Sequence, residues 1–95
     1  MRNMAYHHMK PRFQLGRTVA TPGALDLGIA LSRYIHRHHC GDWGDLCEED
    51  KEANEDSLEA GERLLSCYQV GGGKRLYIIT ERDRSVTTAL LPEEY

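Results

Sequence analysis

The chain has 95 residues, of which 40% are hydrophobic and 28% are charged, with a formal net charge of −3. We expect one small domain, because compact domains run from about 50 to 250 residues. No stretch approaches the roughly 20 apolar residues of a membrane-spanning helix, and residues 1–12 lack the apolar segment of a secretory signal. The three cysteines, Cys40, Cys47 and Cys67, cannot all pair within the chain, which favours a reducing cytoplasm.

Charge is distributed unevenly along the chain. Residues 1–41 carry six Lys or Arg against one acid, whereas residues 42–62 carry ten acids against one lysine. The N-terminal part of the chain is therefore basic and the middle part is acidic, although the net charge is small. Such asymmetry can steer a charged partner. The alternative is that the acids only solvate an exposed helix face.

Residues 1–12 predict a flexible leader, because they show neither helical nor strand periodicity. Residues 13–95 are expected to form a single α+β domain. A short extended segment around Gly16 begins this domain. Thr21-Pro22 then predicts a helix start, in which a hydroxyl N-cap precedes a proline in the first turn.

Two N-terminal helical segments are expected within the domain. Apolar residues at helical spacing carry the first segment to Gly41, with a break near Ser32. The second segment covers residues 46–60 and is rich in glutamate. It ends at Gly61, a residue that suits a helix C-cap.

After Gly61 the periodicity changes from helical to alternating, which predicts strands. The runs 63–70, 76–80 and 86–91 favour strands, and the glycines at 71–73 predict a hairpin turn between the first two. We therefore expect an α+β fold in which two N-terminal helical segments pack on a three-stranded antiparallel C-terminal meander. An uncovered edge or face on so small a sheet leaves a homodimer as an open alternative.

The densest group of chemically active side chains lies between His36 and Cys47. Imidazole and thiolate bind zinc, and His36 and Cys40 are spaced to share one helix face. A structural zinc site usually has two separated ligand pairs, and the sequence shows no second pair, so neither a metal nor another cofactor is expected. The candidate ligands, if there were a metal, are His36, His38, Cys40 and Cys47.

Catalysis is not expected either, because the sequence lacks a Ser-His-Asp order, a phosphate-binding loop and a dinucleotide fingerprint. His38 near Asp42 or Asp45 could nevertheless pair a general base with an orienting carboxylate. The rival hypothesis is therefore a small metal-dependent hydrolase or zinc-binding protein centred on His38, Asp42 and Cys40.

Trp43 is the only tryptophan, and it lies within a glycine- and aspartate-rich turn. It either anchors the turn by inserting into the core or protrudes as an interface hot spot. We favour the anchor. In that interpretation Asp42 or Asp45 caps the second helical segment.

The second helical segment also offers a row of carboxylates to a partner. Glu48, Glu52 and Glu55 could imitate phosphates and occupy a basic nucleic-acid groove on another protein. Direct binding of nucleic acid is not expected, because the isoelectric point is about 5.9 and nucleic-acid-binding domains normally present a basic face.

One pattern in the sequence resembles a known family. It consists of Gly41-Asp42-Trp43-Gly44-Asp45, Glu49-Asp50, Asn54, and the runs 77–81, 84–88 and 90–95. With His38 in front, the first run reads His-x-x-Gly-Asp-Trp-Gly. Residues 13–95 thereby resemble a family of small bacterial proteins found on plasmids and integrated mobile elements, some of which carry a type I restriction subunit M label.

This resemblance implies a genetic setting and no particular activity. It points to a shared role for His38, Asp42, Trp43, Gly44, Asp50 and Asn54. His36, His39 and Cys40 lie outside the pattern, which further disfavours a metal site. Asn54 could bond a turn backbone and hold the loop in place.

These features together predict a non-enzymatic, cytoplasmic accessory protein of a mobile element. It is expected to act through a protein partner that the sequence does not identify. The residues expected to take part in binding are Trp43, Asp42, Asp45, His38, Asp50, Asn54, Glu48, Glu52 and Glu55.

Overall fold

The computed structural model describes residues 10–95, so residues 1–9 of the predicted leader lie outside the described part of the chain. The strands are β1 (Arg17–Ala20), β2 (Leu64–Gly71), β3 (Lys74–Thr80) and β4 (Val86–Leu90). The helices are α2 (Pro22–Asp26), α3 (Leu31–His39) and α4 (Glu48–Ala60), and a 3₁₀ turn η1 (Pro92–Glu94) follows β4. The four strands form one sheet in the order β1-β4-β3-β2.

The sheet corrects the predicted fold. β2, β3 and β4 do pair antiparallel in chain order, but β1 adds a fourth strand that runs parallel to β4, with Arg17 opposite Val86. The expectation of a three-stranded antiparallel sheet is therefore wrong, because the sheet is mixed and has four strands. The expected extended segment around Gly16 leads directly into this additional strand.

Two helices, α2 and α3, replace the first expected helical segment. Thr21 Oγ1 accepts a hydrogen bond from the Ala24 N–H (3.2 Å), so the threonine caps α2 as predicted. Gly28 then takes a φ of +67°, a left-handed conformation that glycine adopts at little cost. The break therefore lies at Gly28, and α3 begins just before Ser32. No helix within residues 10–95 is long and apolar enough to cross a membrane.

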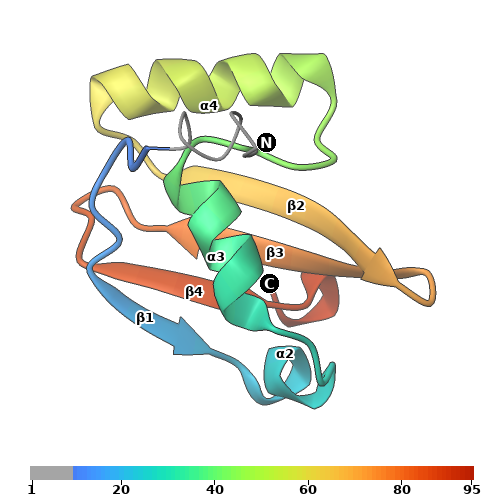
Figure 1. The fold of residues 1–95 in the computed structure, drawn as a ribbon. Helices are drawn as coiled ribbons and strands as arrows, with labels where there is room; N and C mark the ends of the chain where they lie inside the picture. Colours follow the sequence, from blue (N-terminus) through green and yellow to red (C-terminus); the bar gives the residue numbers. More distant parts are fainter. Residues whose placement is uncertain (1–9) are drawn as a thin grey trace, which may run out of the picture.

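The hydrophobic core lies between the sheet and the helices α2 and α3. Figure 1 shows α3 lying across one face of the sheet. The buried residues of this core are Ala24, Tyr68, Leu76, Ile78 and Ala89. Tyr34 and Ile35 of α3 pack against them. This packing places the C-terminal end of α3 beside the turn that contains Trp43.

The opposite face of the sheet carries the C-terminal segment. Tyr77 lies on this face, because side chains alternate along β3, and Tyr95 packs edge-on against it at 5.9 Å between ring centroids. Glu94 accepts a hydrogen bond from Thr21 Oγ1 (2.5 Å), which ties the end of the chain to the start of α2.

α4 lies beyond the β2 edge of the sheet, away from α2 (Figure 1). Gly61 ends it with a φ of 73°, as the C-cap signal predicts. Its N-cap is Cys47, which makes no side-chain capping bond. The expected cap from Asp42 or Asp45 is therefore wrong, since both aspartates bond other partners.

Candidate functional site

The 41–45 loop closes the outer edge of β2. The Cys67 N–H donates to the Trp43 carbonyl (3.3 Å), and the Asp45 N–H donates to the Cys67 carbonyl (2.7 Å). The Asp45 carboxylate accepts a further bond from the Gln69 N–H (2.8 Å). An open strand edge is a template for unwanted pairing. The loop therefore acts as a short cover strand for β2.

Asn54 continues this cover from α4. Its Nδ2 donates to the Leu65 carbonyl (2.6 Å), and its Oδ1 accepts from the Leu65 N–H (3.2 Å). One side-chain amide thus makes the pair of bonds that a neighbouring strand would make. Asn54 is only 6% exposed, so it fixes α4 to β2 and is unavailable to a partner. The sequence suggested that Asn54 bonds the backbone of a turn, but its amide bonds the edge of a strand.

Asp42 and Gly44 shape the loop from within. The two carboxylate oxygens of Asp42 accept from Arg37 Nε (2.7 Å) and from the Gly44 N–H (3.1 Å). Burial favours the neutral carboxyl, but these hydrogen bonds outweigh it and lower the pKa of Asp42. Gly44 has a φ of +79°, and a Cβ there would lie 2.1 Å from the Cys67 carbonyl oxygen. Only glycine fits at this contact.

His38 lies fully buried in a chain of polar groups. Its Nδ1 is 2.5 Å from Ser66 Oγ, and its Nε2 is 2.9 Å from Thr80 Oγ1. Thr80 Oγ1 in turn lies 2.7 Å from Thr87 Oγ1, and Thr87 donates to the Leu15 carbonyl (2.7 Å). This series of hydrogen bonds links α3 to three strands and to the segment before β1.

The Leu15 carbonyl, the last acceptor in this series of hydrogen bonds, determines which atom donates in each bond. A carbonyl can only accept, so Thr87 donates to it and Thr80 donates to Thr87. His38 then donates from Nε2 to Thr80 and accepts at Nδ1 from Ser66. Burial, followed by nearby positive charge, lowers the pKa of His38 to about 3, so the ring is neutral at neutral pH. Both ring nitrogens are occupied, which leaves none to bind a metal or take a substrate proton.

Trp43 is anchored, with 4% of its surface exposed. Phe13 stacks on the indole at 6.2 Å, and the His38 ring meets it edge-on at 5.8 Å between centroids. Indole Nε1 donates to Glu55 (2.9 Å), and Arg12 makes two bonds of 2.8 Å to the same carboxylate. These bonds, that from Arg12 first, lower the pKa of Glu55 to about 2. Trp43 is therefore a core residue and presents no indole to a partner.

The residues proposed for the rival hydrolase or zinc centre do not come together in the structure. Within residues 10–95 no group of three His, Cys, Asp or Glu side chains could hold a metal ion. Cys47 is exposed at the start of α4, and His38 is enclosed by hydroxyl groups. Only His36 and Cys40 lie together, with Nε2 and Sγ 3.8 Å apart.

The acidic helix α4 is the exposed part of the candidate site. Seven of its thirteen residues are acidic, and Lys51 is its single basic residue. The acidic residues are all exposed: Glu48, Glu49, Asp50, Glu52, Glu55, Asp56 and Glu59. At 3.6 residues per turn, Glu48, Glu52 and Glu59 lie in one row, with about 6 Å of helix axis between residues four apart. Glu55 belongs to the same row but is held by Arg12.

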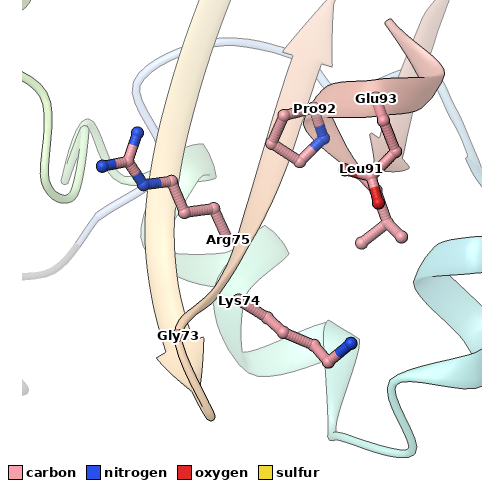
Figure 2. A pocket seen from close by; sticks show the side chains of 6 residues that line it. All are labelled: Gly73, Lys74, Arg75, Leu91, Pro92 and Glu93. Carbon is pink, nitrogen blue, oxygen red and sulfur yellow. The ribbon is translucent and has the colours of Figure 1, made fainter.

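A hollow of about 260 Å³ lies between the β2–β3 turn and the start of η1 (Figure 2). Its lining residues are Gly73, Lys74, Arg75, Leu91, Pro92 and Glu93. Figure 2 shows Arg75 reaching across β2, whereas Lys74 extends to the other side of the hairpin. Ligand sites need a few convergent polar groups, and these two cations diverge. The hollow therefore takes no part in the candidate site.

Sequence reasoning missed the partners that hold the site together. Ser66, Thr80 and Thr87 read as ordinary strand residues, and Arg12 falls in the predicted leader. The available signal was the alternation along β2, β3 and β4, which places these hydroxyl side chains on the face of the sheet that carries the hydrophobic core.

No protein-family model, curated protein or solved structure matches the chain. The resemblance to plasmid and mobile-element proteins therefore stays a prediction. Of the residues to which the resemblance gives a shared role, His38, Trp43 and Asn54 are buried, Asp42 and Gly44 are half-buried, and Asp50 is exposed.

Proposed function

We propose that the chain is a non-enzymatic, cytoplasmic binding protein that presents the acidic face of α4 to a cationic protein partner. One observation carries the proposal. The polar side-chain atoms of His38, Trp43 and Asn54 bond within the fold, and Trp43 and Asn54 hold in place α4, a helix with seven exposed acidic side chains.

The acids of α4 exceed what the helix needs for its own stability. Like charges four residues apart, as in Glu48 with Glu52, Glu52 with Asp56 and Glu55 with Glu59, destabilise a helix by about 0.2–0.5 kcal/mol a pair. Glu59 also lies in the last turn, where the helix dipole disfavours negative charge. A face that served only solvation could alternate lysine with glutamate and avoid both costs. A cationic partner would relieve this repulsion.

The chemistry of the partner follows from the row of carboxylates. Regularly spaced negative charges offer lysine and arginine side chains what a phosphate backbone offers them. The partner class is therefore a protein with a basic nucleic-acid groove, and occupying that groove would inhibit nucleic-acid binding. A mobile-element setting, taken from the sequence resemblance, belongs to the same proposal.

A titration with a ten-residue polyarginine peptide, followed by NMR, tests whether α4 is the cation-binding face. Shifts should concentrate in α4, and the double variant Glu52→Gln/Glu59→Gln should weaken binding about fivefold, which corresponds to about 1 kcal/mol. The matched control is Asp26→Asn/Glu93→Gln, which removes two exposed charges from α2 and η1, away from α4 (Figure 1). Equal losses in the two double variants would show that the acids of α4 only solvate the helix.

A further inference from the structure

His36 and Cys40 place two metal-ligand atoms together at the C-terminal end of α3. Cys40 Sγ lies 3.8 Å from His36 Nε2. A tetrahedral zinc ion, with a Zn–S bond of about 2.3 Å and a Zn–N bond of about 2.0 Å, holds such atoms about 3.5 Å apart. The pair therefore needs an adjustment of only about 0.3 Å to chelate a cation of this kind.

Both side chains are accessible. His36 is exposed, and Cys40 is a half-buried free thiol. Within the described residues, their hydrogen bonding is to each other. The last turn of a helix carries partial negative charge, which favours a bound cation. Arg37, the nearest arginine in sequence, is already paired with Asp42 at 2.7 Å.

Two donors leave a tetrahedral ion half-coordinated, and residues 10–95 supply no third His, Cys, Asp or Glu to the pair. The outward positions of α3, Ser32, Arg33 and His36, are exposed, so a second α3 can approach this face. A second copy brings an identical pair and completes a Cys₂His₂ set, the donor set of many structural zinc sites.

We infer that His36 and Cys40 form a half-site for zinc, which the same pair of a second copy completes, so that one ion links two chains. Each Cys40 thiol releases a proton to water as its sulfur binds the ion, and each neutral His36 binds through Nε2. No electrons are transferred. Burial raises the pKa of the Cys40 thiol, so the metal has to displace a bound proton.

Two measurements on the full chain test this inference. Light scattering with and without zinc should show the mass doubling at one ion per two chains. Cobalt, used as a spectroscopic substitute, should give a thiolate-to-cobalt charge-transfer band. Cys40→Ser and His36→Ala should abolish the dimer and weaken cobalt binding at least about tenfold, while melting curves confirm that both variants fold.

Matched variants separate the alternatives. Cys47→Ser removes an exposed thiol elsewhere on the chain and should keep both the dimer and the cobalt band. His7→Ala/His8→Ala tests whether imidazoles of the leader complete the site, and it should have no effect. A zinc-linked dimer that survives Cys40→Ser would overturn the inference. So would a monomer that binds cobalt through Cys40, because the second copy would then be absent.

Discussion

A single side-chain amide joins α4 to the edge of β2, and Asn54→Asp tests that joint by exchanging one group of nearly the same shape. The Asn54 Nδ2 lies 2.6 Å from the Leu65 carbonyl oxygen. Aspartate would place a carboxylate oxygen there, so that two acceptors face each other in a site that is 6% exposed. Leaving a buried acceptor unsatisfied costs about 1–3 kcal/mol. The charge adds to this cost, because α4 already carries seven acids.

The loss should depend on pH in a defined direction. Burial and the surrounding acids raise the pKa of the introduced carboxyl above the value of about 3.9 of a free aspartate. The protonated carboxyl has an O–H that can donate to the Leu65 carbonyl and restore the bond. Folding therefore favours the protonated form. Stability is retained below the pKa of the unfolded chain and is lost as pH rises through the pKa of the folded protein.

Urea unfolding of the wild type and of the variants, compared at pH 4 and pH 7, measures the effect. At pH 7 Asn54→Asp should lower the free energy of unfolding by about 3 kcal/mol, more than Asn54→Ala, whose smaller side chain lets water reach Leu65. At pH 4 the deficit of Asn54→Asp should shrink, whereas that of Asn54→Ala should not.

Asp56→Asn is the matched control for these variants, since it exchanges the same two side-chain types at an exposed position of α4. It should change stability by less than about 0.5 kcal/mol. If Asn54→Asp unfolds at the same urea concentration as the wild type at pH 7, the amide does not hold α4 to β2.

Two further predictions concern His38 and Gly44. Because its pKa is lowered from 6.5 to about 3, the His38 ring should stay neutral and protonated at Nε2 down to about pH 4. The unfolded chain then binds the extra proton, and the free energy of unfolding falls on acidification by up to about 1.4 kcal/mol per pH unit. Nitrogen NMR shifts of a charged ring at pH 5 would contradict this. Gly44→Ala should cost more than about 2 kcal/mol, because its Cβ would strike the Cys67 carbonyl. Gly72→Ala, with a φ of +60° but open space around it, should cost about 1 kcal/mol, so equal melting temperatures would refute the steric argument.

Local chemistry explains which parts of the fold the sequence could predict. Thr21 and Gly61 act within one helical turn, so their capping roles are legible without tertiary structure. The hairpin of β2 and β3 is equally local, with three glycines of positive φ at its turn. β1 is different, because four residues are too few to show a period and their partner is the last strand of the chain. Its pairing depends on the finished sheet.

The same distinction applies to the candidate site. The pattern around Trp43 marks the loop that covers β2, and the anchor role of Trp43 follows from one large apolar side chain in a tight turn. The caps predicted from Asp42 and Asp45 were wrong because each carboxylate accepts a hydrogen bond from a donor outside α4. The donor is Arg37 for Asp42 and the Gln69 N–H for Asp45. Neither donor is adjacent in the sequence. The series of hydrogen bonds through His38 also connects separate strands, so no pattern in the linear sequence predicts it.

The buried arrangement determines how binding experiments on this protein should be interpreted. Trp43→Ala would remove a donor to Glu55 and the surface on which Phe13 stacks. It would loosen α4 and alter the acidic face without Trp43 ever touching a partner. Glu52→Gln and Glu59→Gln act at the surface alone, since both side chains are exposed. A loss of binding that appears in these variants while the melting temperature is unchanged locates recognition on α4. A loss seen only in the Trp43 variant would mean that the substitution disturbed the packing along the β2 edge, and it would not locate recognition at Trp43.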